Sequence, residues 1–187
     1  MQFIILVGPK HSGKTSAGRE LQKLLDCGFT DLDELIALQT GKSPRALYAE
    51  GPAIFRKAEA EAVGREQGAI NNGQKASVLA AGGGIIDNQE AMATIKNIPS
   101  ATIAYLNVSA ETAWERISRE DELPPFLIDT GELAIGRDQA KMRHRVLHER
   151  RAAAYRQIAS VTIEAEGKSP QEIAAEIAQM SRGEFSR

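Results

Sequence analysis

The strongest constraint on the fold lies at the N-terminus, where an apolar run meets a glycine-rich segment. Residues 2–7 (QFIILV) are rich in β-branched side chains, which predicts a strand buried on both faces, as in a parallel sheet. Residues 8–15 (GPKHSGKT) then match the pattern G-x-x-x-x-G-K-[ST]. A helix is predicted over 14–25, with Leu21, Leu24 and Leu25 on its inner face. The segment therefore has the strand–loop–helix context that this pattern requires.

The chemistry of the motif needs these residue types in this order. Gly8 and Gly13 let the backbone fold tightly, so that successive N–H groups can point at phosphate oxygens, and the following helix adds the partial positive charge of its N-terminus. Lys14 is predicted to reach the β- and γ-phosphates and to act in catalysis, and the Thr15 hydroxyl is predicted to bind Mg²⁺. The alternative is a glycine turn that binds nothing. The predicted nucleotide-binding segment consists of Gly8, Pro9, Lys10, His11, Ser12, Gly13, Lys14, Thr15 and Ser16.

Further strands and helices alternate along the chain. Strands are predicted at 28–30, 77–81, 102–106 and 160–163, and helices at 32–39, 44–50, 53–67, 89–96, 109–119, 137–157 and 170–181. Asn88 and Ser109 are suitable N-caps, and Pro170 suits a first helical turn. Alternating strands and helices predict an α/β fold with a parallel sheet and right-handed crossovers. The length of 187 residues indicates one domain, 1–187.

Residues 119–136 interrupt this alternation. They contain two prolines, two glycines and five acidic residues without clear periodicity. Long loops of this kind are often active-site lids, so we predict a mobile lid, with an ordinary surface excursion as the alternative. Residues 182–187 are expected to form a frayed tail.

Composition excludes several classes of partner. A net charge of −2 gives no electrostatic footprint for nucleic acid or a membrane surface, and no apolar run is long enough to span a bilayer. A single cysteine excludes an intrachain disulfide framework and fits a reducing compartment. We therefore expect a cytoplasmic protein that binds neither nucleic acid nor membrane, and we expect a monomer.

Two later segments predict an acceptor site. Asp31 and Asp33 follow the predicted second strand, where carboxylates can either act in chemistry or cap the next helix. Gly82, Gly83 and Gly84 follow the predicted third strand, where bare backbone can approach a ligand in the crevice of an open α/β sheet. The alternative for the glycines is a flexible turn.

Taken together, these motifs resemble the shikimate kinase family. The P-loop, the D-x-D of residues 31–33, the F-R-x-x-E of residues 55–59, the G-G-G and a late Arg151…Tyr155 occur in the order of that family, from about residue 3 to 180. The resemblance implies a three-layer P-loop kinase fold, with a five-stranded parallel sheet in order 2-3-1-4-5 flanked by helices. It also implies ATP and Mg²⁺, a small carboxylate as the other substrate, and phosphorylation of the 3-hydroxyl of shikimate for aromatic amino acid biosynthesis.

The same resemblance assigns roles to individual residues. Asp33 corresponds to a catalytic, acceptor-binding carboxylate and Asp31 to the acid near Mg²⁺. Arg56 and Arg151 correspond to the arginines that hold the carboxylate, which suits the planar guanidinium group, and Glu59 to the residue that orients Arg56. The remaining implied contacts are Gly82, Gly83 and Gly84 for the acceptor and Arg116 and Pro170 for the nucleotide.

The lid departs from the family pattern. The family carries Arg-Pro-Leu-Leu there, with an arginine on the transferring phosphate, whereas this chain reads Pro124-Pro125-Phe126-Leu127. An arginine in this role can contribute about 10³–10⁵-fold in rate. We expect Arg119 or Arg137 to replace it, with Arg119 favoured because it lies nearer in sequence to the lost position. The alternative is that both arginines only balance neighbouring acids such as Glu120, Asp121 and Asp138. Two alternatives are a related kinase for another hydroxy or sugar acid and a catalytically weak nucleotide-binding homologue.

The predicted helix 137–157 carries two histidines four residues apart. His144 and His148 could form one face of a metal site, but their charged neighbours favour a solvated surface. Trp114 is expected to pack its helix against the sheet.

Overall fold

A five-stranded parallel sheet organises the protein. The computed structural model describes residues 3–71, 77–128 and 136–183. All strand pairs are parallel, and the order is β2-β3-β1-β4-β5. The strands are β1 (Phe3–Val7), β2 (Gly28–Asp31), β3 (Ser77–Ala80), β4 (Ala101–Asn107) and β5 (Val161–Glu164). The predicted α/β class and strand order are confirmed.

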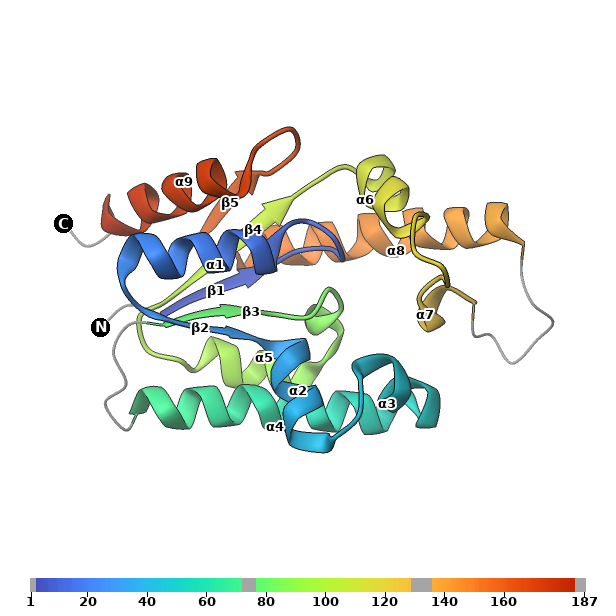
Figure 1. Ribbon diagram of the computed structural model, residues 1–187, viewed down its shortest axis with the longest axis horizontal. Coiled ribbons are helices and arrows are strands. Elements are labelled where there is room, and N and C mark those ends of the chain that lie inside the picture. The colour runs from blue at the N-terminus through green and yellow to red at the C-terminus, as the bar shows by residue number, and fades with distance from the viewer. Residues whose placement is uncertain (1–2, 72–76, 129–135, 184–187) are drawn as a thin grey trace.

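Helices cover both faces of the sheet and form three layers (Figure 1). One face carries α1 (Lys14–Leu25) and α9 (Pro170–Gly183), and the other carries α4 (Pro52–Asn71), α5 (Gln89–Lys96) and α8 (Arg137–Ile158). The shorter helices are α2 (Leu32–Thr40), α3 (Pro44–Glu50), the 3₁₀ turn η1 (Ile85–Asp87), α6 (Ala110–Ile117) and α7 (Pro125–Ile128). Figure 1 shows α3, α6 and α7 gathered beyond the carboxyl ends of the strands.

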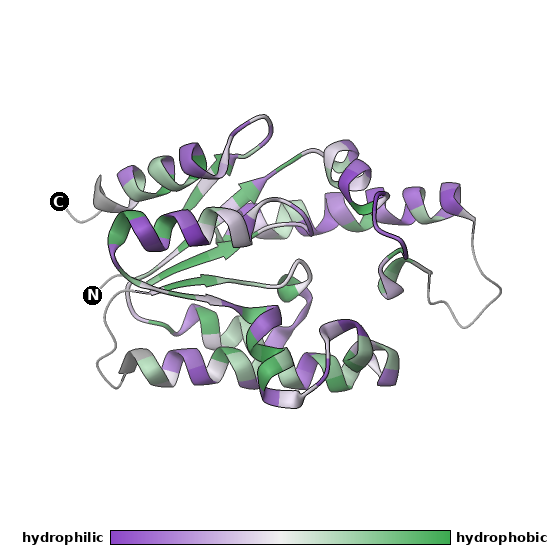
Figure 2. Ribbon diagram, in the orientation of Figure 1, coloured by the Kyte–Doolittle hydropathy of each residue, from purple (hydrophilic) through white to green (hydrophobic). Residues whose placement is uncertain are grey.

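The alternation of side chains along β1 explains why both faces are covered. Ile4 and Leu6 belong to the core shared with α1 and α9, whereas Phe3, Ile5 and Val7 belong to the core on the opposite face. All five side chains are buried, and Figure 2 shows the strands as an apolar centre between helices of mixed polarity. A strand buried on both faces needs a continuous apolar run, which is what residues 3–7 provide.

Most predicted boundaries agree with the structure. The side chains of Asn88 and Ser109 accept hydrogen bonds from the N–H groups of Ala91 and Thr112, as N-caps do, and Pro170 begins α9. Helix α4 extends beyond the predicted 53–67, and α6 ends at Ile117. No helix of the described residues has the length and apolarity needed to cross a membrane.

The segment predicted as a lid is partly helical rather than a loop throughout, because α7 occupies Pro125–Ile128. Residues 129–135 of the predicted lid and residues 184–187 of the predicted tail lie outside the described residues.

A third apolar cluster connects α6, α7 and α8, and it corrects two predictions. Trp114 packs with Leu127 and Ala140 in this cluster rather than against the sheet. His144 and His148 are buried, with 5% and 8% of their surface exposed, so the expected solvated face is wrong there. Burial lowers the pKa of His144 to about 4, so its ring is neutral. No group of three or more His, Cys, Asp or Glu side chains within residues 3–71, 77–128 and 136–183 could hold a metal ion.

Candidate active site

The loop between β1 and α1 has a backbone that needs glycine at two positions. Gly8 has φ 146°, and a Cβ there would lie 2.6 Å from the Leu106 carbonyl oxygen. Gly13 has φ 96° and immediately precedes α1. Residues with a side chain rarely adopt such positive φ angles. The Cβ contact at Gly8 would be with backbone atoms, which cannot move aside. Residues of this loop and the N-terminus of α1 line one cavity, an arrangement suited to phosphate.

Lys14 lies at the bottom of this loop. Its Nζ donates to the carbonyl oxygens of Gly8 and Pro9 at 3.1 and 2.8 Å. Burial lowers its pKa to about 8, although the nearby charges of Asp33 and Asp31 act in the opposite direction. The ammonium group is therefore held by neutral oxygens, which a phosphate can replace with a stronger, charged partner.

Thr15 and Asp31 form the pair that could hold a divalent cation. The Thr15 hydroxyl donates to Oδ2 of Asp31 at 2.6 Å. Oδ1 of the same carboxylate accepts from the backbone N–H groups of Asp33 and Glu34 at 3.0 and 3.3 Å, so Asp31 also caps α2. The capping alternative is therefore correct for Asp31, and it fixes the carboxylate with one oxygen directed at Thr15. Hydroxyl and carboxylate oxygens are the donors that Mg²⁺ prefers.

A cavity adjoins the loop and contains most of the predicted nucleotide-binding residues. Arg116 enters it from α6, and its Nη1 donates to the His11 carbonyl oxygen at 2.6 Å. Pro170 is not among the residues that line this cavity. The lining residues are Lys10, His11, Gly13, Lys14, Thr15, Ser16, Asp31, Asp33, Ala81, Gly83, Arg116 and Arg119.

A second cavity contains the predicted acceptor residues. Its floor is the glycine triplet after β3, where added Cβ atoms would lie 2.9 Å from Oε1 of Glu59 at Gly82 and 2.7 Å from the Lys10 backbone nitrogen at Gly83. At Gly84 the nearest atom would be Nη2 of Arg151 at 3.1 Å. Close approach, rather than a flexible turn, is therefore the reason for glycine here.

Both predicted carboxylate-binding arginines line the acceptor cavity. Arg151 donates through Nε to Oδ2 of Asp87 at 2.8 Å, and its Nη2 forms an ion pair with the same oxygen at 2.8 Å. Its guanidinium group lies 5.3 Å from the centre of the Phe126 ring. The pKa of Asp87 is lowered, because hydrogen bonds and charge from Arg150 and Arg151 outweigh the opposing effect of burial. Arg151 is therefore fixed in orientation, whereas Arg56 is exposed.

Glu59 is linked to Arg56 indirectly. The Asn88 side-chain amide donates to Oε2 of Glu59 at 2.9 Å and to the Arg56 backbone oxygen at 2.7 Å. Oε1 of Glu59 is buried without a hydrogen-bond partner. Burial raises the pKa of Glu59 to about 7.

Asp33 lies where the two cavities meet. Lys10, Asp33 and Gly83 line both of them. Burial and then the neighbouring Asp31 raise the pKa of Asp33, while the charges of Lys14 and Lys10 act against that rise. A carboxylate with a raised pKa, reachable from both cavities, can accept a proton from a hydroxyl on one side as a group transfers from the other.

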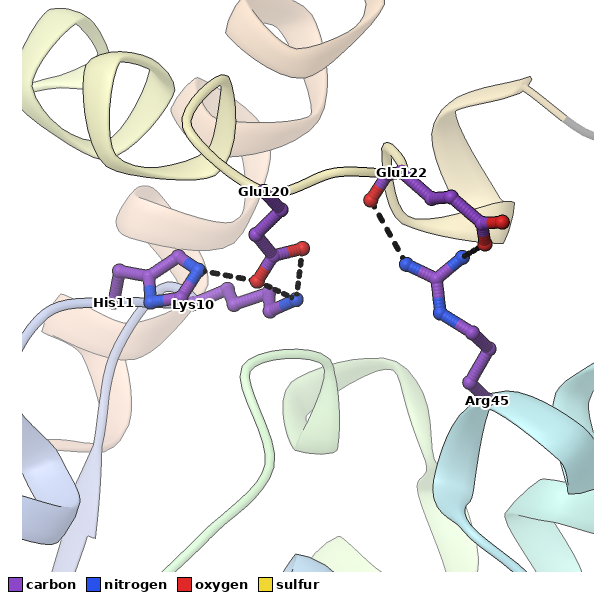
Figure 3. A network of polar contacts seen from close by, with 5 residues as sticks. All are labelled: Lys10, His11, Arg45, Glu120 and Glu122. Atoms are coloured by element: carbon purple, nitrogen blue, oxygen red, sulfur yellow. Dashed lines mark hydrogen bonds and ion pairs between the residues drawn. The ribbon is translucent and has the colours of Figure 1, made fainter.

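The first part of the lid is attached to both sides of this site (Figure 3). Glu120 contacts Lys10 and His11 of the loop. Arg45 donates through Nη1 to Oε2 of Glu122 and through Nη2 to the Glu122 backbone oxygen, both at 2.9 Å. Since Arg45 belongs to α3, the lid joins the nucleotide loop to the helix beside the acceptor cavity.

Sequence patterns do not identify Asp87 or Glu120, and they indicate only the helix-cap role of Asn88. The contact of Lys10 with Glu120 spans 110 positions. A signal was present in the composition, because an acidic lid facing basic loop residues predicts charge pairing, but it does not identify the partners.

These features define an ATP-dependent small-molecule kinase with the P-loop kinase fold. The chain belongs to the shikimate kinase family, whose model matches residues 10–182. It is similar to the shikimate kinases of Persephonella marina (32% identity, covering 95% of this chain and 97% of the relative) and Lactococcus lactis subsp. lactis (34%, covering 93% and 94%). A solved shikimate kinase from Acinetobacter baumannii, in complex with shikimate, has a TM-score of 0.83 at 28% identity, covering 99% of this chain and 95% of that one.

Proposed function

We propose that this protein transfers the γ-phosphoryl group of ATP to a hydroxyl of shikimate. The observation that carries the proposal is the position of Asp33 in the wall common to the nucleotide and acceptor cavities. Relatives named shikimate kinase match nearly the whole chain, and a structural neighbour contains bound shikimate.

The nucleotide occupies the cavity beside the loop, with its phosphates on the backbone N–H groups and on Lys14. Phosphate replaces the carbonyl oxygens of Gly8 and Pro9 as the partner of the Lys14 ammonium group. Arg116 lies at the same cavity and covers the base or ribose. Preorganised donors of this kind stabilise negative charge without reorganising during the reaction.

Thr15 and Asp31 would hold Mg²⁺, which when bound neutralises charge on the β- and γ-phosphates. Their oxygens already lie 2.6 Å apart, and the donor set is the one expected for a hard cation.

The acceptor carboxylate binds between Arg56 and Arg151. A guanidinium group can bind a carboxylate through two parallel hydrogen bonds. Asp87 fixes the Arg151 guanidinium group, and Asn88 holds the backbone of Arg56. Arg56 contributes the uncompensated positive charge, since Arg151 is paired with Asp87.

In the transfer step the acceptor oxygen attacks the γ-phosphorus and forms a new P–O bond. The bond from that phosphorus to the β–γ bridging oxygen breaks, and its electron pair leaves with ADP. The hydroxyl proton passes to the Asp33 carboxylate and then to solvent. The lid limits hydrolysis by excluding water, because Pro124, Pro125 and Phe126 form part of the acceptor cavity.

The test is ADP release with Mg²⁺, ATP and shikimate, coupled to a phosphorus spectrum of the product. We expect shikimate-dependent ADP formation and one phosphate monoester. A panel of other carboxylated polyols serves as the comparison, because the arginine pair predicts a carboxylate in any acceptor. Turnover with another member of the panel and none with shikimate would reject shikimate, and nucleotide binding without turnover on any of them would reject kinase activity.

A further inference from the structure

We propose that the Lys10 side chain contacts the phosphoryl group during transfer and supplies positive charge that the lid of this chain lacks. The inference rests on the proposed phosphoryl transfer and adds a catalytic residue to it. Lys10 belongs to the loop, where sequence reasoning assigned it to nucleotide binding without a role for its side chain.

Lys10 lies between the nucleotide cavity and the acceptor cavity. A phosphoryl group that moves from the nucleotide cavity to the acceptor cavity must move past the residues that line both cavities. Three residues line both cavities, namely Lys10, Asp33 and Gly83, and of these Lys10 alone is cationic. The Lys10 backbone lies directly against Gly83. The approach is so close that a Cβ at Gly83 would lie 2.7 Å from the Lys10 nitrogen and 3.1 Å from its Cα.

The lid offers no equivalent charge at this place among the described residues. Its part that faces the acceptor cavity is Pro124, Pro125 and Phe126. Arg119 lines the nucleotide cavity but not the acceptor cavity. Nη2 of Arg137 donates to the Ser118 backbone oxygen at 3.2 Å, and Arg137 lines neither cavity. The geometry therefore favours Lys10 over the two arginines that we expected from the sequence.

Lys10 is already bound to an anion at this place (Figure 3). Its Nζ lies 2.5 and 2.7 Å from the two carboxylate oxygens of Glu120. Nε2 of His11 lies 2.7 Å from Oε1, and since an ionised carboxylate can only accept, the ring N–H donates. Burial alone would raise the pKa of Glu120, but hydrogen bonds from Lys10 and His11 lower it, so the carboxylate is charged.

An ammonium group has three N–H donors, and Glu120 takes two contacts. The third donor is available to a phosphoryl oxygen at the shared wall. Charge there matters most when the transferring group lies between its two partners, so the contact should increase kcat more than nucleotide affinity. Glu120 holds Lys10 while no phosphate is present and is itself not required for the step.

The test compares Lys10→Met, Lys10→Arg and Glu120→Gln, with Lys57→Met as the matched control. Lys57 lies on α4 with a side chain 78% exposed and a 4.0 Å pair to Glu61. We expect Lys10→Met to lower kcat by about 10²–10³-fold, with the Kd for ADP within about threefold. Lys10→Arg should restore at least a tenth of the activity, and Lys57→Met should match the parent. Unchanged ADP binding shows that a variant is folded.

Glu120→Gln separates catalysis from simple attachment of the lid. It removes most of the ion pair but leaves Lys10 in place, so kcat should stay within about fivefold of the parent, as partly exposed pairs are weak. An equal decrease of kcat in Lys10→Met and Glu120→Gln would mean that Lys10 acts only as a contact for the lid. Lys10→Met with kcat within about threefold of the parent would also overturn the proposal.

A second measurement does not depend on the identity of the acceptor. Aluminium fluoride bound with ADP imitates the transferring phosphoryl group, and the parent should bind the pair more tightly than ADP alone. In Lys10→Met this increase in affinity should be smaller by about 10-fold or more, while the affinity for ADP alone stays normal. If the parent fails to turn over shikimate but Lys10→Met loses this gain, the proposed substrate is wrong and the role of Lys10 stands. If Lys10→Met keeps the full gain, Lys10 does not contact the group.

Discussion

The Thr15 hydroxyl donates to Oδ2 of Asp31 at 2.6 Å, while Oδ1 of the same carboxylate caps α2. One side chain thus serves the fold with one oxygen and the candidate metal site with the other. The two roles can be separated, because asparagine caps helices about as well as aspartate but carries no charge.

We predict that Asp31→Asn raises the Mg²⁺ concentration needed for half-maximal activity by about 10-fold or more, since a hydrogen bond or contact to a charged group contributes roughly 1.5–3 kcal/mol. The thermal midpoint should change little. The measurement is ADP release against Mg²⁺ at saturating ATP. Thr15→Ser keeps the hydroxyl and is the control, which should retain the parent Mg²⁺ dependence. An unchanged Mg²⁺ dependence in Asp31→Asn would remove this carboxylate from the metal site.

The pH dependence of nucleotide binding should report Lys14. Burial lowers its pKa to about 8 in the free protein, so the ammonium group loses its proton as the pH rises through that value. Phosphate binds the charged form, and affinity should fall by up to about tenfold for each pH unit above 8. A non-hydrolysable ATP analogue titrated from pH 7 to 9.5 measures this. Lys14→Met should bind weakly with a flat profile, and a flat profile in the parent would contradict the prediction.

Arg56→Lys should weaken acceptor binding although the charge is kept. Lysine cannot form the two parallel hydrogen bonds of a guanidinium group, and the loss of a charged hydrogen bond costs about 1.5–3 kcal/mol, which is roughly 10–150-fold in KM for shikimate. The KM for ATP should not change. Arg65→Lys is the control, because Arg65 lies exposed on the same helix and lines neither cavity. Equal changes in both KM values would show that Arg56 does not hold the carboxylate.

Glu59 should make stability depend on pH. Burial raises its pKa to about 7 from 4.5, so the folded protein favours the protonated form. The stabilisation of the folded protein by the protonated Glu59 carboxyl is complete below pH 4.5 and is lost as the pH rises through 7. Glu59→Gln stays neutral and can still accept the hydrogen bond from Asn88. As the pH rises from 5 to 8, the free energy of unfolding of the variant should therefore increase relative to that of the parent by on the order of 3 kcal/mol.

Urea unfolding at several pH values gives this difference. Glu61→Gln, whose side chain is 62% exposed on the same helix, should follow the parent at every pH. Parallel curves for the parent and Glu59→Gln would mean that the Glu59 carboxyl ionises normally in the folded protein.

The sequence predicted the parts of this structure that depend on local patterns. The run at residues 2–7 indicated a doubly buried strand, which the structure has at Phe3–Val7, and the glycines of the loop indicated a tightly folded backbone, because both features follow from neighbouring residues. The sheet order came from the resemblance to a family rather than from the residues themselves.

Local sequence patterns do not predict contacts between distant segments. His144 and His148 have charged neighbours, which suggested solvent, but packing of α8 against α6 and α7 buries both rings. Asp87 carried no signal in its own surroundings, and its role depends on Arg151, 64 positions later. The assignment of particular arginines, aspartates and glycines to the two substrates stays a prediction until variants are measured.

The attachment of the lid on both sides implies cooperation between the two substrates. Glu120 reaches the loop and Glu122 reaches α3, so one short segment contacts both halves of the site. If this segment acts as a lid, its opening would break both contacts together, and we expect a ligand that favours the closed form to prepare the other cavity as well. Thermodynamic linkage makes this effect reciprocal. Whatever factor ATP contributes to the affinity for the acceptor, the acceptor contributes the same factor to the affinity for ATP.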